Sequence, residues 1–290
     1  MTRSARRRSS SDRGPAIPGE TCAFPGLVVT AGEYTLYVLL ARSERPGRSP
    51  DAPGPLPVAA IVIDFDGTAS EEDVSYRLFQ RFGLPGWREL DAEFEREAIG
   101  SRECLLAQAA LLDAKPDEML EFVAERFGLA PTFPAFVAWA RDRGVALSIA
   151  SDGLGFHVAP MLRAGGVGGV DVFTNEFSSL GGSPAFSFPN EHPLCRTCGT
   201  CKMEIVTRRR SQGPVAFVGD GFSDRLGALY ADVVFAKGHL AAFCQERGVP
   251  FVPWTTFDDV RRELERGPSL PGPVETEAAR CPGWSAAEGA

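Results

Sequence analysis

Short apolar runs, each followed by a polar or glycine-containing turn, recur along the chain from residue 58 onward. The first covers residues 58–63 and ends directly at Asp64. Most of the other runs are rich in Val, Ile or Phe, and they cover residues 145–150, 170–173, 215–218, 233–235 and 249–252. Because helical patterns separate these runs, they predict a parallel sheet covered by helices on both faces, an α/β fold with a Rossmann-like core.

The segment between the first two runs has the period of amphipathic helices instead. Apolar residues recur three and four positions apart, and glycines or a proline interrupt the pattern. Four helices are therefore expected, covering residues 71–82, 86–98, 101–113 and 116–127. We expect residues 71–130 to form a helical cap inserted into a core made of residues 58–70 and 131–266.

Two further elements are expected in the second part of the core. Residues 132–143 have a helical pattern that leads back to the sheet. Residues 177–180 and 185–188 flank Gly181 and Gly182, which predicts a β-hairpin.

The two ends of the chain differ in composition from this body. Residues 1–57 and 267–290 are rich in Pro, Gly, Arg, Ser or Ala and have no sustained helical or strand period. Such segments bury too little apolar surface to order themselves, so we expect a disordered leader and a disordered tail. No apolar run approaches the roughly 20 residues that span a bilayer, and no membrane partner is expected.

Composition then narrows the class of protein. The chain has 290 residues, 44% of them hydrophobic, which is enough for a core with a smaller inserted domain. A formal net charge of -8 argues against a nucleic-acid partner and favours small-molecule chemistry. Seven cysteines are an odd number and too few for a disulfide-stapled secreted fold, which favours the cytoplasm. The sequence leaves the oligomeric state open.

A pair of carboxylates follows the first predicted strand. Asp64 and Asp66 are separated by one residue, and Gly67 permits a sharp turn after them. Ligands of doubly wound sheets bind beyond the carboxyl ends of the strands, so both acids are expected at the site. The alternative is an ordinary Asp-Gly turn.

A second acidic pair follows the strand predicted at residues 215–218. Asp220 and Asp224 stand four positions apart, and Asp224 could alternatively cap the next helix. Four acids brought together need a cation. Mg²⁺ suits them because it binds one or two carboxylates together with waters and phosphate oxygens.

Two more positions offer groups that bind phosphate. Ser151 directly follows the run 145–150 and offers a hydroxyl, and Lys202 follows a cluster of cysteines and offers a positive charge. Either residue alone would be unremarkable in an exposed loop. Because they follow the first acidic pair in this order along the chain, we interpret them as phosphate-binding residues.

In this order the four motifs resemble those of the haloacid-dehalogenase superfamily, over residues 58–266. The pattern is Asp-x-Asp-Gly-Thr, then a Ser at a strand end, then Lys, then Gly-Asp-x-x-x-Asp. The resemblance implies a phosphatase in which Asp64 attacks phosphorus and forms an aspartyl phosphate. Asp66 would protonate the leaving oxygen and then deprotonate the hydrolytic water.

The same resemblance implies the roles of the remaining motif residues. Ser151 and Lys202 would hold the phosphoryl oxygens. Mg²⁺ would be bound by Asp64, the backbone carbonyl of Asp66 and Asp220, with Asp224 supporting the waters of the metal.

The helical insertion resembles the cap of the phosphoserine-phosphatase-like branch. Within that branch, Trp87 and the stretches 198–202, 219–224 and 231–236 are most similar to the 2-hydroxy-3-keto-5-methylthiopentenyl-1-phosphate phosphatases of methionine salvage. This similarity implies hydrolysis of a small phosphorylated metabolite, with that compound as a candidate. Alternatives are a phosphoserine phosphatase, a phosphotransferase, or a non-catalytic phosphate-binding or zinc/thiol regulatory protein.

The resemblance also suggests where the substrate is recognised. Asp73 stands where the branch places an acidic substrate contact, although it could equally be an Asp at a helix N-terminus. Arg102 and Trp87 are the next candidates in the cap.

A cluster of possible zinc ligands precedes the lysine. His192, Cys195, Cys198 and Cys201 recur with two-residue gaps, and zinc prefers these ligand types. Bound structural zinc, reduced thiols and a regulatory disulfide are the three open interpretations. The other histidines, including His157 and His239, are expected to be structural or exposed.

Overall fold

The computed structural model describes residues 56–180 and 183–275. The predicted leader, residues 1–57, and the predicted tail, residues 267–290, lie mostly outside these residues, as does the Gly181–Gly182 turn. Within the described ranges, no helix is both long and apolar enough to cross a membrane.

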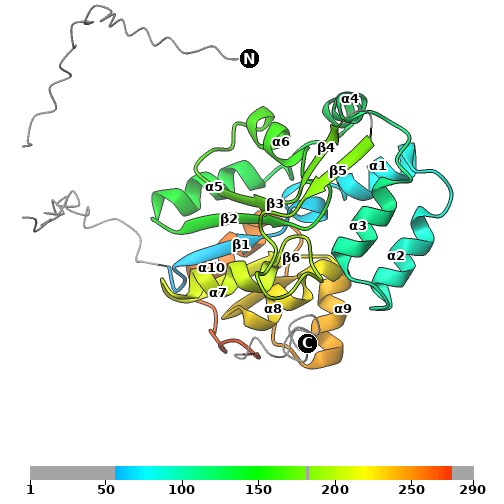
Figure 1. Ribbon diagram of the computed structural model, residues 1–290. Coiled ribbons are helices and arrows are strands. Elements are labelled where there is room, and N and C mark those ends of the chain that lie inside the picture. Colours follow the sequence, from blue (N-terminus) through cyan, green and yellow to red (C-terminus); the bar gives the residue numbers. More distant parts are fainter. Residues whose placement is uncertain (1–55, 181–182, 276–290) are drawn as a thin grey trace, which may run out of the picture. The chain divides into compact units, whose positions relative to one another are not determined.

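Six parallel strands form one sheet in the order β3-β2-β1-β6-β7-β8. Strands β3, β2, β1 and β6 of this sheet are labelled in Figure 1. The central strand β1 aligns Ile61 with Leu147 of β2 on one side and with Ala216 of β6 on the other. The predicted parallel α/β sheet is thereby confirmed. The strands are β1 (Ala60–Ile63), β2 (Ala146–Ser151), β3 (Asp171–Thr174), β6 (Val215–Gly219), β7 (Val233–Ala236) and β8 (Val252–Pro253).

Helices cover both faces of this sheet, which explains why its central strands are apolar throughout. Ile61 and Ile63 of β1 belong to a core shared with α5 (Phe133–Asp142), α6 (Val158–Ala164) and α10 (Phe257–Arg266). Ala60 and Val62, which alternate with them, pack in a second core with helices on the opposite face. These are α7 (Lys202–Arg210), α8 (Arg225–Tyr230) and α9 (Gly238–Arg247).

The last strand differs from the prediction. A strand is predicted at residues 249–252, but β8 only begins at Val252. Val249 instead closes helix α9: Gly248 has a left-handed backbone, and the N–H of Val249 donates to the carbonyl of Cys244 at 2.8 Å. An apolar residue after a helix C-cap is buried for this reason and carries no strand signal of its own.

Four helices connect the end of β1 to α5, as the periodicity predicts. They are α1 (Val74–Phe82), α2 (Trp87–Glu95), α3 (Ser101–Ala109) and α4 (Pro116–Arg126). Trp87 is buried among them, with its ring 5.2 Å from that of Tyr76 and 5.9 Å from that of Phe79. It therefore packs the inserted helices together. An antiparallel bridge between Ser70 and Leu129 closes the base of the insertion.

The predicted hairpin is also present. Strands β4 (Glu176–Leu180) and β5 (Ser183–Ser187) pair antiparallel, with Phe177 opposite Phe186. Their rings lie 5.1 Å apart.

Candidate active site

The chain turns sharply where β1 ends. The N–H of Asp64 donates to the carbonyl of Val218 at 2.9 Å, so its position is fixed by the neighbouring strand β6. A kinked turn, η1 (Phe65–Ala69), follows, with non-helical backbone angles at Asp66 and Gly67. Gly67 has φ +76°, and a Cβ added there would lie 2.6 Å from Oδ2 of Asp220. Only glycine satisfies both the backbone conformation and this close approach.

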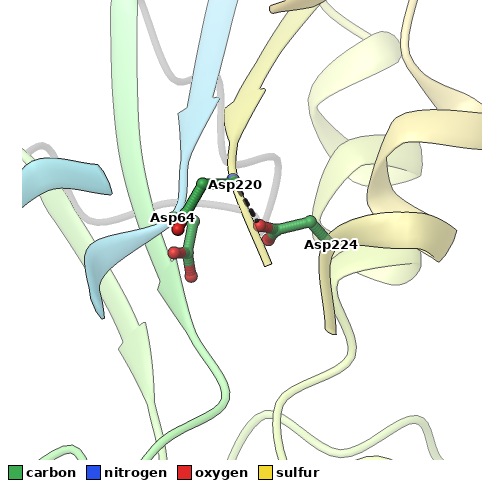
Figure 2. A group of neighbouring side chains, drawn as sticks. All are labelled: Asp64, Asp220 and Asp224. Atoms are coloured by element: carbon green, nitrogen blue, oxygen red, sulfur yellow. Dashed lines mark hydrogen bonds between the residues drawn. The ribbon is translucent and has the colours of Figure 1, made fainter. Parts of the chain in front are cut away.

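Three carboxylates meet at this point. One oxygen from each of Asp64, Asp220 and Asp224 lies within 4.8 Å of the others (Figure 2). Oδ1 of Asp220 accepts a hydrogen bond of 2.5 Å from Oγ1 of Thr68. Hard cations bind oxygen ligands of this type, so the three residues could hold a metal ion.

Asp224 also holds the loop after β6. Its Oδ2 accepts hydrogen bonds from the N–H groups of Asp220 at 2.9 Å and Gly221 at 2.8 Å. Asp224 thus caps a backbone turn and is part of the carboxylate group. Asp224 stands at the N-cap position of α8, but its side chain makes no capping hydrogen bond to that helix and binds the preceding loop instead.

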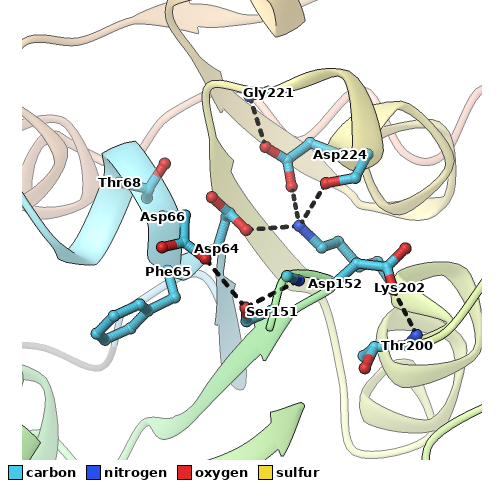
Figure 3. A network of polar contacts seen from close by, with 12 residues as sticks. Asp64, Phe65, Asp66, Thr68, Ser151, Asp152, Thr200, Lys202, Gly221 and Asp224 are labelled. Atoms are coloured by element: carbon cyan, nitrogen blue, oxygen red, sulfur yellow. Dashed lines mark hydrogen bonds and ion pairs between the residues drawn. The ribbon is translucent and has the colours of Figure 1, made fainter. Parts of the chain in front are cut away.

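Lys202 is buried in the middle of the carboxylates (Figure 3). Its Nζ donates to Oδ1 of Asp64 at 2.5 Å, to Oδ1 of Asp224 at 2.7 Å and to Oγ of Ser223 at 3.0 Å. Burial alone would lower the pKa of Lys202, but Asp224 and Asp64 raise it above its ordinary value. The lysine is therefore charged.

One lysine does not balance the negative charge around it. Burial, together with the charge of Asp224, raises the pKa of Asp64 well above its ordinary value despite Lys202. Burial and Asp224 also raise the pKa of Asp220 to about 6. Both shifts have the direction expected for carboxylates that crowd together without enough positive charge. A bound cation fits this arrangement.

Asp66 points away from the three carboxylates. Its Oδ1 accepts from the N–H groups of Val74 at 3.1 Å and Ser75 at 3.2 Å, and its Oδ2 accepts from the Ser75 hydroxyl. The buried Ser151 hydroxyl lies 3.5 Å from Oδ2. Burial would raise the pKa of Asp66, but His157 and the hydrogen bonds from His157 and Ser75 lower it. Asp66 is a carboxylate in this conformation.

His157 belongs to the site, although the sequence predicts only a structural or exposed residue. It is fully buried, and its Nε2 lies 3.0 Å from Oδ1 of Asp66. The rings of Phe65 and Phe156 flank it at 5.7 and 5.6 Å. Nδ1 has no hydrogen-bond partner among the described residues, and Nε2 faces the Asp66 carboxylate, which can only accept. The sequence feature that could have indicated this role is the position of His157 in the loop that follows Ser151 and the end of β2.

Asp152 is a second residue that sequence reasoning missed. It is buried and accepts hydrogen bonds from Oγ of Ser101 at 2.5 Å, the N–H of Thr200 at 2.7 Å and Nδ2 of Asn175 at 3.2 Å. Asp152 therefore connects the start of α3 with the loop that precedes Lys202. A Ser-Asp pair after a strand gives no sequence signal for this role.

The carboxylates open into a cavity of about 320 Å³. Asp73 lies at its edge, where its side chain accepts from the N–H of Tyr76 at 2.8 Å and caps α1. Arg102 is not among the residues that line it, and pairs with Glu191. Lining residues include, from the core, Asp64, Asp66, Asp152, Asp220 and Phe222, and, from the insertion, Asp73, Tyr76, Phe79, Asp91, Phe94, Glu95 and Gln108.

The zinc alternative is not supported. In the described part of the chain, no three of His192, Cys195, Cys198 and Cys201 bring their ligand atoms within 4.8 Å of one another. Nδ1 of His192 accepts from the N–H of Leu194, while the thiol of Cys195 donates to Thr197. A two-residue spacing in an irregular loop does not make the side chains converge.

The fold can be compared with solved structures. A phosphoserine phosphatase, solved as a phospho-aspartyl intermediate analogue, aligns with a TM-score of 0.55 and 17% identity over 72% of this chain and 99% of that chain. A HAD-family hydrolase from Salmonella enterica aligns with a TM-score of 0.57 and 17% identity over 73% of this chain and 72% of that chain. At 17% identity these two comparisons show the fold alone, and it is the fold of a phosphoserine phosphatase and of a HAD-family hydrolase.

Sequence similarity is higher to one group of phosphatases. The 2-hydroxy-3-keto-5-methylthiopentenyl-1-phosphate phosphatase of Geobacillus kaustophilus is 31% identical over 210 residues, which is 71% of this chain and 95% of that protein. The protein of the same name from Geobacillus thermodenitrificans is 32% identical over 210 residues, with the same coverage. No family model matches the chain. The chain belongs to the family of 2-hydroxy-3-keto-5-methylthiopentenyl-1-phosphate phosphatases.

Proposed function

We propose that this phosphatase is a magnesium-dependent phosphomonoester hydrolase that transfers the phosphoryl group of a small metabolite first to Asp64 and then to water. The observation that carries the proposal is the convergence of Asp64, Asp220 and Asp224 around Lys202 at the end of the central strand. A nucleophile, a positive charge for the phosphate and a group of metal ligands are thereby within reach of one another.

The donor set fits Mg²⁺, since it consists of oxygens and retains room for waters and phosphate. Asp64, Asp220 and the backbone carbonyl of Asp66 would hold the ion, while Asp224, whose oxygens already bind Lys202 and two backbone N–H groups, would support its waters. When bound, Mg²⁺ supplies positive charge that offsets the carboxylates and the phosphoryl oxygens.

The chain's own residues would then perform two steps. An oxygen of Asp64 bonds to phosphorus as the bond to the leaving oxygen breaks, with Lys202 and Ser151 holding the phosphoryl oxygens. Asp66 gives a proton to the leaving oxygen and later takes one from the water that attacks the aspartyl phosphate. The negative phosphate beside Asp66 favours its protonated form, which the first step requires.

We also propose a division of labour between the core and the insertion. Residues 58–70 and 131–266 would supply the phosphoryl chemistry, and residues 71–130 would act as a cap that excludes water and shapes the leaving-group site. The lining of one cavity by residues from both parts supports this division.

The leading candidate substrate is 2-hydroxy-3-keto-5-methylthiopentenyl-1-phosphate, because the relatives of that name share about 31% identity over 71% of the chain. Phosphoserine is the second candidate, and it rests on fold similarity at 17% identity. The cytoplasmic location remains a prediction from the cysteine content.

Metal dependence gives the first test of this function. Release of nitrophenol from para-nitrophenyl phosphate should stop when EDTA removes divalent metal, and excess Mg²⁺ should restore it, because uncompensated carboxylates repel the substrate phosphate. The Asp220→Asn variant should need a higher Mg²⁺ concentration for half-maximal rate. Full activity of the metal-free enzyme would contradict the proposal.

A role for His157 in the reaction has its own test. His157→Phe should lower kcat by roughly 10- to 100-fold with little change in KM, because the ring keeps its aromatic surroundings but Asp66 loses a donor. His157→Gln retains a side-chain N–H and should lie closer to wild type. Kinetics with an alkyl phosphate, whose leaving group needs a proton, measure this. Unchanged kcat in both variants would make His157 a packing residue only.

A further inference from the structure

The cavity has a second acidic wall, formed by the inserted helices. Asp91 and Glu95 stand one turn apart on α2, and Asp73 caps α1. Among the described residues that line the cavity there is no Lys or Arg, and the lining includes the exposed His239 of α9. A leaving group in this part of the cavity meets crowded carboxyl groups: burial, together with Asp66, raises the pKa of Asp73 to about 7, and burial raises the pKa of Asp91 above its ordinary value. An additional anion is disfavoured beside such groups.

Asp91 is held in place by a buried amide. Gln108 of α3 is 2% exposed, and its Nε2 donates to Oδ1 of Asp91 at 2.6 Å and to the carbonyl of Trp87 at 3.1 Å. Because both amide hydrogens of Gln108 are used in these two bonds, Gln108 holds the Asp91 carboxylate in place and has no N–H left to donate to a ligand. The second oxygen of Asp91 is left to accept from a hydroxyl or amino group.

Aromatic side chains form the rest of this wall. Phe94 of α2 packs edge-on against Phe222 of the core, with ring centroids 5.0 Å apart. Phe79 and Tyr76 of α1 line the same space. These rings offer apolar surface to an uncharged portion of a substrate. They also lower the local dielectric, which strengthens repulsion between Asp91 and any second anion.

We propose that this wall selects phosphate esters whose leaving group has hydroxyl or amino donors and carries no carboxylate, and that Asp91, fixed by Gln108, is a specificity-determining residue. The inference rests on the proposed function, since it assigns the leaving-group side of the same cavity. It ranks the two candidate substrates. The ammonium group of phosphoserine suits Asp91, but its carboxylate meets an acidic wall that lacks Lys and Arg among its described residues. A methylthiopentenyl ketone is uncharged apart from its phosphate.

A matched pair of substrates tests the inference. Glycerol 3-phosphate and 3-phosphoglycerate differ in having a hydroxymethyl group or a carboxylate at the same position. We expect kcat/KM of the wild type to be at least about tenfold higher for glycerol 3-phosphate. Asp91→Asn should shrink this ratio severalfold, chiefly by improving 3-phosphoglycerate. Glu89→Gln removes an exposed acid of α2 that does not line the cavity, and the ratio should stay at the wild-type value.

Binding gives a readout that does not depend on turnover. Calorimetric titration of both phosphates with Mg²⁺ into the Asp64→Asn variant, which is expected to stay folded without turning them over, should show the same preference for glycerol 3-phosphate. Equal kcat/KM and equal binding for the pair would overturn the inference and leave the proposed function standing. A clear preference in binding without hydrolysis of either compound or of para-nitrophenyl phosphate by the wild type would support the inference and contradict the proposed function.

Discussion

Asp64→Asn should lower kcat by at least about 10⁴-fold, the scale seen when a nucleophile is removed from an enzyme that works through a covalent intermediate. The amide nearly matches the carboxylate in shape but does not attack phosphorus. The fold should persist because Lys202 keeps its ion pair with Asp224 at 2.7 Å. Steady-state kinetics and circular dichroism on the same preparation separate loss of chemistry from loss of structure.

Asp232→Asn is a suitable control for this variant. Asp232 is also a buried aspartate with an ion pair, to Arg210 at 3.0 Å, but it holds the N–H of Val215 at the opposite end of β6. Its substitution should cost stability and leave kcat within about twofold. Activity of Asp64→Asn within tenfold of wild type would contradict the assignment of the nucleophile.

The largest effect on stability is expected from Lys202→Met. Removing the cation leaves Asp64 and Asp224 buried with no partner charge, a change that typically costs about 3–5 kcal/mol of unfolding free energy. Urea unfolding at pH 7 without metal measures this loss, and added Mg²⁺ should recover part of it. Activity should be lost as well, because the phosphoryl group no longer meets the lysine.

The loss should also depend on pH. The pKa of Asp64 is raised by burial in the folded protein, so the folded state holds its proton more tightly than the unfolded state does. Stability from this group therefore falls as pH rises, and Lys202→Met should be less destabilised at pH 5 than at pH 7. Lys237→Met, whose lysine lies over the ring of Trp254, should show a smaller loss. Equal losses of unfolding free energy in both variants would contradict the claim that Lys202 offsets the buried charge of Asp64 and Asp224.

The convergence of the motif residues was predictable because it follows from the sheet. In a parallel sheet the carboxyl ends of all strands lie at one edge, so Asp64 and Asp220 were expected at the same edge once both strands were recognised. They are close together because β1 and β6 are neighbours in the sheet. The apolar runs identified these strands because both of their faces are buried. The helical insertion was equally plain from its period.

Side-chain direction was beyond the reach of sequence patterns. Nothing in the sequence indicated that Asp66 accepts hydrogen bonds from the first residues of α1, because this depends on how the inserted helix packs. The backbone of the loop before Lys202 positions the lysine, which the sequence did not indicate either. The N–H of Cys201 donates to the carbonyl of Asn190, and the N–H of Thr200 donates to the carboxylate of Asp152. The cysteine spacing left zinc, reduced thiols and a disulfide open, and in the described part of the chain no three of the four possible zinc ligands converge.

Trapping the phosphoenzyme tests the central claim most directly. Asp66→Asn should slow hydrolysis of the intermediate, so that rapid quenching in acid after addition of para-nitrophenyl phosphate captures a covalent phosphoryl group. Borohydride reduction of an aspartyl phosphate gives homoserine, which peptide mass spectrometry locates in the sequence. We predict homoserine at position 64 and a phosphoryl stoichiometry near one per chain. A phosphoryl group on Ser151 or His157, or turnover with no trapped phosphoryl group, would contradict the mechanism.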